Sequence, residues 1–157
     1  DAVKFQTYKT ALLGPPDAPK AEYQKRTTDS AESQYAMLHR LELSPPMHRE
    51  ILAQCQQEGI IFLSSPFDEE SVELLNALQV PAFKIPSGEI TNAPFLLAIA
   101  RAAQKVIMST GMSTLSEVKN ALGVLSFGFT VFYQLFFENV SNIIIFVYLW
   151  LDKIGKA

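Results

Sequence analysis

Two lysines and a glycine-containing turn are the parts of this sequence best suited to chemistry. Lys4 and Gln6 stand two apart in one apolar run, Lys84 lies inside another, and a third run ends at Ser109 and continues into the turn 109–113. Turn amides ahead of a helix favour phosphate, and each lysine adds a point charge. The sequence therefore predicts a site for a small, highly charged anion. The alternative is that the two lysines are edge residues that reach solvent.

Hydroxyls and one carboxylate are expected at the ends of the predicted strands. Glu89 follows Ser87 and Gly88 where a strand should end, and Ser64 and Ser65 close another strand. A carboxylate beside two lysines could transfer protons or orient water. Taken singly, Glu89 could equally be a solvent-facing residue, and the serines could be turn residues.

The histidines and the single cysteine carry weaker signals. His39 and His48 are nine residues apart on predicted helices, a spacing that does not bring two imidazoles onto one metal, so we expect both at the surface. Cys55 is expected to pack on a helix face. A lone cysteine forms no internal disulfide, which favours a reducing compartment and predicts a cytoplasmic protein. The formal net charge of −3 gives no overall basic field, so nucleic acid is not an expected partner.

Strand-length apolar runs alternate with helical patterns in the first 122 residues. The runs are 2–7, 60–64, 82–85 and 106–109. Helix starts are indicated by Ser44 before Pro45, by Asp68 before two glutamates, and by Thr114 with Glu117 as a capping box. The last three runs start at residues 60, 82 and 106, so successive starts are 22 and 24 residues apart. This spacing is the length of one strand, one crossover helix and two short loops. This order predicts a parallel sheet.

The placement of polar residues favours one of two parallel-sheet folds. An open sheet gathers polar groups at one switch point, whereas a (β/α)8 barrel lines the carboxyl ends of successive strands with them. Lys4, Gln6, Lys84 and the serines follow the second pattern. We therefore expect an α/β fold, a partial TIM barrel of about four parallel strands with helices. The longer first gap holds a proline-rich loop at 14–30 and a predicted helix, which we expect to cover an active site.

Composition changes sharply near Gly123. All nine prolines lie at or before Pro94, 25 of the 29 charged residues precede Gly123, and nine of the 17 aromatic residues lie between 127 and 151. We divide the chain into a partial barrel domain, 1–122, and an apolar tail, 123–157. The apolar run 143–151 is shorter than the about 20 residues that a spanning helix needs, so we do not expect a membrane span. The tail could cover a free sheet edge, or could be sequence joined out of frame to a truncated enzyme.

Five blocks of residues closely resemble the bacterial sialic acid synthases, the family of the N-acetylneuraminate, N,N'-diacetyllegionaminate and pseudaminate synthases. The blocks are DAVKFQTYK (1–9), SQY (33–35) with LELS (41–44), GIIFLSSPFD (59–68), VPAFKIPSGEI (80–90) and STGMST (109–114). The resemblance runs in order from residue 1 to about residue 122, and the tail departs from the family. Five blocks in register are far more specific than one short motif.

The resemblance implies both a fold and a reaction. The fold is a (β/α)8 barrel, often followed by an antifreeze-like domain in a domain-swapped homodimer. The reaction condenses phosphoenolpyruvate with an N-acetylated amino sugar of the N-acetylmannosamine type, in its open aldehyde form, to give a nonulosonic (sialic) acid and phosphate. In that chemistry C3 of the enol attacks the aldehyde carbon, water adds to C2, and phosphate leaves by C–O cleavage. The resemblance also implies a divalent metal, Mn²⁺ or Mg²⁺, that polarises the aldehyde.

Through the matching motifs, the resemblance assigns the family's substrate-binding and catalytic roles to residues of this chain. Those that would hold the carboxylate and phosphate of phosphoenolpyruvate are Lys4, Ser65, Lys84, Ser87 and Ser109. Gln6 would contact the sugar, and Glu89 would act with Lys84 in catalysis and face the metal-bound water. The family usually has threonine where Ser65 stands, and serine keeps the hydroxyl.

Three parts of the family pattern are expected to lie outside this chain. They are the first barrel strand with its glutamate, the strands that bear two metal-ligand histidines, and the antifreeze-like domain. Neither His39 nor His48 matches those ligands, so we assign no metal ligand here and expect no synthase activity from the chain alone. The amino sugar is left unassigned, because the residues that contact it lie largely outside the chain. Two other interpretations are a barrel aldolase with a Schiff base at Lys84, and a non-catalytic, membrane-associating product.

Overall fold

A five-stranded parallel sheet forms the centre of the computed structural model, which describes residues 1–20, 22–28, 32–103, 105–111, 113–133 and 143–146. The strands are β1 (Ala2–Thr7), β2 (Ile61–Pro66), β3 (Phe83–Ile85), β4 (Val106–Ser109) and β5 (Ile143–Phe146). Each strand pairs in parallel with the next one along the chain, in the order β1-β2-β3-β4-β5. Parallel neighbours need crossover connections, and helices supply them.

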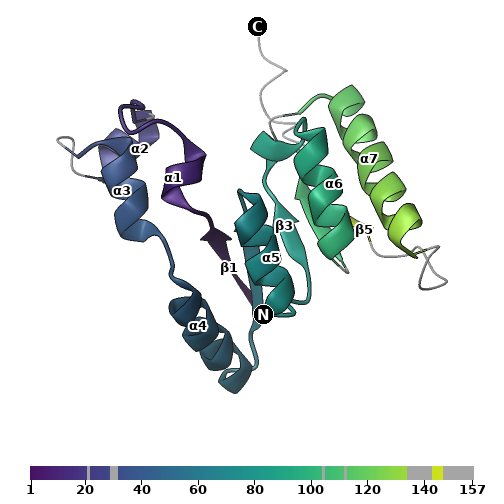
Figure 1. Ribbon diagram of the computed structural model, residues 1–157, viewed down its shortest axis with the longest axis horizontal. Coiled ribbons are helices and arrows are strands. Elements are labelled where there is room, and N and C mark those ends of the chain that lie inside the picture. The colour runs from purple at the N-terminus through teal and green to yellow at the C-terminus, as the bar shows by residue number, and fades with distance from the viewer. Residues whose placement is uncertain (21, 29–31, 104, 112, 134–142, 147–157) are drawn as a thin grey trace, which may run out of the picture.

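The helices lie mainly on one side of this sheet. The longer ones are α4 (Pro45–Gln57), α5 (Glu69–Ala77), α6 (Ala93–Ala102) and α7 (Leu115–Tyr133). Helices α5, α6 and α7 lie side by side over one face (Figure 1). The short helices α1 (Thr10–Leu13), α2 (Glu22–Thr27) and α3 (Gln34–Leu41) form an arm beside β1, and a 3-10 turn, η1 (Ser87–Glu89), follows β3. The predicted alternation of four parallel strands with helices is confirmed. In the part of the chain that the structure describes, no helix is long and apolar enough to cross a membrane.

The fifth strand comes from the segment that composition assigned to the tail. β5 pairs with β4 in parallel register, with Val106 opposite Ile143 and Ser109 opposite Phe146. Three consecutive β-branched residues, 143–145, suit a strand. Helix α7 runs without a break through Gly123, so the sequence boundary between 122 and 123 falls inside a helix. The other tail residues, 134–142 and 147–157, lie outside the described part of the chain.

Two carboxylates fix helix starts as the sequence predicts. Asp68 Oδ1 accepts a hydrogen bond from Ser71 N (2.7 Å) at the start of α5, while Asp68 Oδ2 accepts one from Lys9 N (2.7 Å) just after β1. Thr114 N donates to Glu117 Oε2 (2.6 Å), and Glu117 N donates to Thr114 Oγ1 (3.3 Å). These reciprocal bonds confirm the predicted capping box ahead of α7.

The hydrophobic core lies between the sheet and helices α5, α6 and α7. Its buried members include Phe62, Phe83, Ile85, Val106 and Met108 from the strands and Leu75, Leu96, Ile99 and Leu125 from the helices. Side chains alternate along a strand, so the residues between these positions face the other way. On that side Lys4 and Gln6 are exposed and Ile61 is 52% exposed. We call this side the open face.

The crossing of α6 and α7 depends on a glycine. A Cβ at Gly128 would lie 2.6 Å from Ala100 Cβ and 3.1 Å from Leu97 Cδ1. Gly128→Val is therefore expected to lower the free energy of unfolding by about 1–3 kcal/mol, because the two helices must separate. Urea unfolding measures the change. Gly123→Ala is the matched control on the same helix: a Cβ there would meet no described atom within 4 Å, and alanine should stabilise the helix by about 0.5–1 kcal/mol. Equal stability of Gly128→Val and the unmodified chain would contradict the close packing.

Candidate functional site

Strand pairing brings five of the predicted site residues to the open face. They are Lys4, Gln6, Ser65, Lys84 and Ser109. Gln6 lies opposite Ser65 in the pairing of β1 with β2, and Lys84 continues the same row on β3, because Ser64 lies opposite Phe83. Paired residues of parallel strands project from the same side of a sheet. The predicted convergence of these residues on one side is therefore built into the register.

Lys84 is the most constrained of these side chains. Its Nζ donates hydrogen bonds to Ser109 Oγ (2.6 Å) and to the carbonyl oxygen of Ile85 (2.8 Å). Burial, and to a smaller extent the Lys4 ammonium, lowers the pKa of Lys84 from 10.5 to about 8. The influence of Lys4 means that the two ammonium groups are close enough to repel each other. An anion placed between them would be attracted by both.

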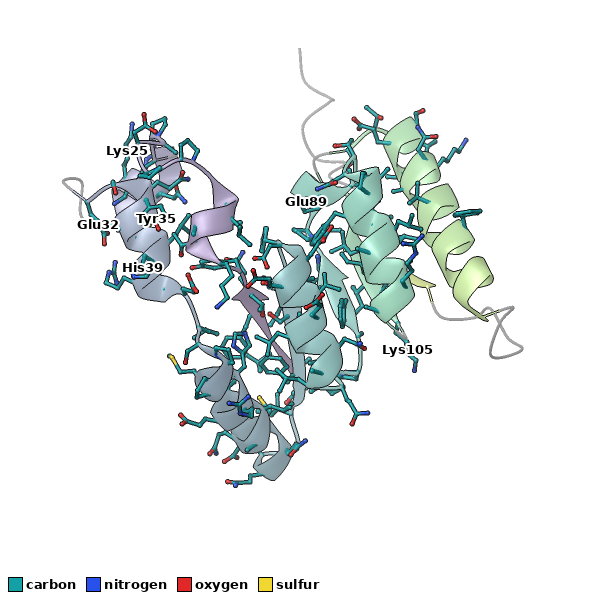
Figure 2. The ribbon with its side chains drawn as sticks, viewed as in Figure 1. Lys25, Glu32, Tyr35, His39, Glu89 and Lys105 are labelled. Atoms are coloured by element: carbon teal, nitrogen blue, oxygen red, sulfur yellow. The ribbon has the colours of Figure 1, made fainter. Side chains whose placement is uncertain are left out.

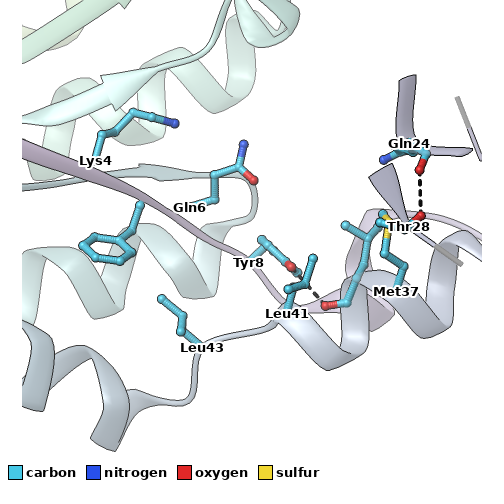
Figure 3. Close-up of a pocket in the computed structure, with 10 residues that line it drawn as sticks. Lys4, Gln6, Tyr8, Gln24, Thr28, Met37, Leu41 and Leu43 are labelled. Carbon is cyan, nitrogen blue, oxygen red and sulfur yellow. Dashed lines mark hydrogen bonds between the residues drawn. The ribbon is translucent and has the colours of Figure 1, made fainter. Parts of the chain in front are cut away.

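Lys4 and Gln6 also line a cavity of about 560 Å³ between β1 and the arm. Figure 3 shows the Lys4 and Gln6 side chains on one side of the strand, and Met37 and Leu41 of the arm also line the cavity. Tyr8 also lines this cavity, and its hydroxyl donates a hydrogen bond to the carbonyl oxygen of Leu38 (3.0 Å). Burial, together with the Glu42 carboxylate, raises the pKa of Tyr8. The long first connection therefore borders the site residues of β1.

Ser87 and Glu89 were expected where a strand ends, and they lie in η1, directly after the carboxyl end of β3. Figure 2 shows Glu89 at this end of the sheet, with Lys105 at the opposite end. The Glu89 carboxylate accepts a hydrogen bond from Asn92 Nδ2 (2.9 Å), and Asn92 in turn caps α6. Within the described residues, neither Lys4 nor Lys84 forms an ion pair with Glu89. The side-chain hydrogen bond described for this carboxylate therefore comes from an amide.

A buried polar network behind the site includes a residue that the sequence placed wrongly. His48 was expected at the surface, but its side chain is completely buried. Thr7 Oγ1 lies 2.9 Å from His48 Nε2 and 2.7 Å from Ser64 Oγ, and His48 Nδ1 lies 3.0 Å from the carbonyl oxygen of Ser44. That carbonyl only accepts, so Nδ1 carries a proton, and in neutral His48 Nε2 accepts from Thr7. These bonds satisfy the imidazole, which explains why it can be buried.

The remaining histidine and the cysteine behave as predicted. His39 is exposed and its ring stacks on Tyr35, with centroids 6.2 Å apart. Cys55 is buried on α4 as part of the core. Within the described residues, no three His, Cys, Asp or Glu side chains are grouped so that they could hold a metal ion. Since His48 is engaged by Thr7 and Ser44, the residues described here do not fit a divalent metal site.

Known proteins resemble this chain in both sequence and fold. The model of the NeuB family matches residues 1–142, which reaches beyond residue 122. The N,N'-diacetyllegionaminic acid synthase of Campylobacter jejuni is 50% identical over 125 residues, covering 80% of this chain and 37% of that protein. The synthase of the same name from Legionella pneumophila is 46% identical over 122 residues, covering 78% of this chain and 34% of that protein. The chain thus spans about a third of the length of these relatives.

A solved structure supports the predicted fold class. The crystal structure of an N-acetylneuraminic acid synthetase from Leptospira borgpetersenii matches with a TM-score of 0.64 at 24% identity. The match covers 81% of this chain and 40% of that one. At this level of identity the likeness concerns the fold alone. It confirms that the parallel strands and helices described above belong to a partial barrel.

Proposed function

Because this chain belongs to the NeuB family of sialic acid synthases, we propose that it supplies the phosphoenolpyruvate-binding side of such a synthase. The complete enzyme would condense phosphoenolpyruvate with an N-acetylated amino sugar to give a nonulosonic acid and phosphate. The observation that carries this proposal is the position of Lys84, bound to Ser109 and close to Lys4 on the open face. Two cations and a hydroxyl on one face suit a ligand with a carboxylate and a phosphate.

Each site residue has a role in binding this anion. Lys84 and Ser109, already hydrogen-bonded to each other, would both turn toward the phosphate, and Lys4 would add the second positive charge. Ser65 and Ser87 would donate hydroxyl hydrogens to the remaining oxygens, while Gln6, exposed beside Lys4, would contact the sugar. A bound anion favours the charged form of Lys84, which reverses the pKa depression of the free site.

The same residues would lower the barrier to reaction. When C3 of the enol attacks the aldehyde carbon and water adds to C2, the phosphate accumulates charge as it leaves by C–O cleavage. Lys4 and Lys84 would offset that charge and hold the enol in line. Glu89, oriented by Asn92, would hold the attacking water and accept its proton. The family commonly uses a divalent metal such as Mn²⁺, and the residues of this chain that the structure describes do not supply a site for it.

The relatives also suggest a product class and a setting. Both relatives described above, at 50% and 46% identity, are N,N'-diacetyllegionaminic acid synthases, so we propose a diacetylated nonulosonic acid as the product of the complete enzyme. The homodimer and the cytoplasmic location stay predictions, the second of them supported by the lone cysteine, Cys55.

Calorimetry with the chain alone tests the proposal. Phosphoenolpyruvate should bind, inorganic phosphate should compete with it, and the uncharged ester methyl acetate should not bind. With Mn²⁺ and either N-acetylmannosamine or a diacetylated amino sugar added, the chain alone should form no nonulosonic acid. The absence of any phosphoenolpyruvate binding by folded protein would contradict the proposed site, and product formation would contradict the expected inactivity of the chain.

A chimera tests the complete reaction. In the Campylobacter jejuni synthase, the 125 residues that match this chain would be replaced by their counterparts from it. We expect the chimera to form N,N'-diacetyllegionaminic acid and to lose this activity on Lys84→Gln, whereas Lys105→Gln, an exposed lysine at the far end of the sheet, should leave it unchanged. A chimera that folds, as judged by circular dichroism, but forms no product would contradict the assigned roles.

A further inference from the structure

We propose that the Lys84 side chain is also a reactive amine, which condenses with small anionic aldehydes and 2-oxo acids to form an imine on the open face. This covalent chemistry goes beyond the proposed function, although it uses the same two lysines. It makes Lys84 a modification site for metabolites that carry a carbonyl group next to a carboxylate.

The two hydrogen bonds that Lys84 Nζ donates, together with its bond to Cε, occupy three of the four tetrahedral positions of the nitrogen. Nζ is bonded to Cε and donates to Ser109 Oγ at 2.6 Å and to the carbonyl oxygen of Ile85 at 2.8 Å. Both acceptors can be served by the two hydrogens of a neutral amine. The fourth tetrahedral position then holds the lone pair, and it holds the third hydrogen only when the group is an ammonium. The native contacts of Lys84 are therefore compatible with the nucleophilic form.

The surroundings of Lys84 also favour that form. With a pKa of about 8, about one-tenth of Lys84 is neutral at pH 7, compared with roughly a few in ten thousand for an ordinary lysine. Other lysines have carboxylates as neighbours: Lys9 Nζ lies 3.6 Å from Glu42 Oε1, and Lys20 Nζ lies 3.5 Å from Glu32 Oε2. Lys84 instead faces a second cation, Lys4, which both disfavours its own ammonium and attracts an anionic carbonyl compound.

The reaction balances without an oxidant or a reductant. Lys84 first releases one proton to solvent. The lone pair of Nζ attacks the carbonyl carbon, and a proton moves from nitrogen to the former carbonyl oxygen to give a carbinolamine. The second N–H proton then leaves with that hydroxyl as water, and a C=N bond replaces C=O. The Lys4 side chain pairs with the carboxylate of the adduct.

Reductive trapping of glyoxylate tests the proposal on the chain as it is. The protein would be incubated with glyoxylate and cyanoborohydride, which reduces the imine to a stable secondary amine, and the modified lysines would be located by peptide mass spectrometry. Lys84 should be modified at least about tenfold faster than the exposed Lys105. Its rate should rise about tenfold from pH 6 to pH 7, reach about half of its maximum near pH 8 and level off above pH 8. Acetaldehyde, which lacks the carboxylate, should show a smaller preference for Lys84.

Two variants supply the controls. Lys84→Arg should remove this modification and leave that of Lys105 unchanged. Lys4→Gln should slow modification of Lys84 at pH 7 and move its plateau to higher pH, because a neighbouring cation is lost. Equal rates at Lys84 and Lys105 in the unmodified chain would overturn the proposal.

Protection by phosphoenolpyruvate separates this proposal from the proposed function. If both hold, phosphoenolpyruvate slows the trapping at Lys84. Fast trapping that phosphoenolpyruvate does not affect would support the reactive amine and contradict the proposed substrate site. If calorimetry shows that phosphoenolpyruvate binds but trapping is not selective for Lys84, the result would support the proposed substrate site and contradict the reactive amine.

Discussion

Lys84→Gln is expected to weaken the binding of phosphoenolpyruvate by about ten- to a hundredfold. A hydrogen bond to a charged group contributes about 1.5–3 kcal/mol, and each 1.4 kcal/mol is tenfold in affinity. Glutamine keeps a donor for Ser109 Oγ but removes the charge that the phosphate would meet. Isothermal calorimetry at pH 7 and constant ionic strength measures the change in affinity.

The control for this variant is Lys105→Gln, which changes the net charge equally at the opposite end of the sheet. Its affinity for phosphoenolpyruvate should match that of the unmodified chain. Because Lys84→Gln also removes a half-buried cation that Lys4 repels, it should not lower the stability of the fold. A loss of affinity with a parallel loss of stability would point to misfolding, and equal losses in both variants would contradict a specific role for Lys84.

Thr7→Val is expected to lower the free energy of unfolding by about 1–3 kcal/mol for each buried partner left unsatisfied. The Thr7 hydroxyl is the bridge between His48 Nε2 (2.9 Å) and Ser64 Oγ (2.7 Å), and both partners are fully buried. Valine has nearly the same shape, so the loss reports the hydrogen bonds rather than a cavity. Denaturant unfolding followed by circular dichroism gives the value.

Thr7→Ser is the matched variant, because it keeps the bridging hydroxyl and removes only a methyl group. It should retain most of the stability that Thr7→Val loses. If the two variants are equally destabilised, the methyl group rather than the network stabilises this part of the fold. Since Ser64 precedes Ser65, Thr7→Val should also weaken phosphoenolpyruvate binding more than Thr7→Ser does.

The sequence predicts those features whose physical causes are local. Short apolar runs of strand length predict β1 to β4, and Asp68 and Thr114 mark helix starts, because both signals involve residues only a few positions apart. The shared face of Lys4 and Gln6 follows from their spacing of two. The position of Lys84 on that same face depends on the register of the sheet, in which Gln6 pairs with Ser65 and Ser64 with Phe83.

Features that depend on contacts between residues far apart along the chain could not be predicted from the sequence. Thr7 lies 41 residues before His48 and 57 residues before Ser64 along the chain, so a lone histidine on a predicted helix gave no sign of these hydrogen bonds. The contact between Lys84 and Ser109 spans 25 residues, and the amide partner of Glu89 depends on how η1 leads into α6. β5 was hidden because its composition resembles the tail around it.

Burial of Lys84, with the smaller effect of Lys4, would couple anion binding at the proposed site to proton uptake. The ligand-free chain holds Lys84 partly discharged as pH approaches 8, whereas an anion seated between the two nitrogens stabilises the fully charged pair. Each anion that binds near that pH would therefore take up a fraction of a proton from the buffer. The affinity for the anion would fall as the pH rises above 8, because a larger fraction of Lys84 must then be protonated on binding.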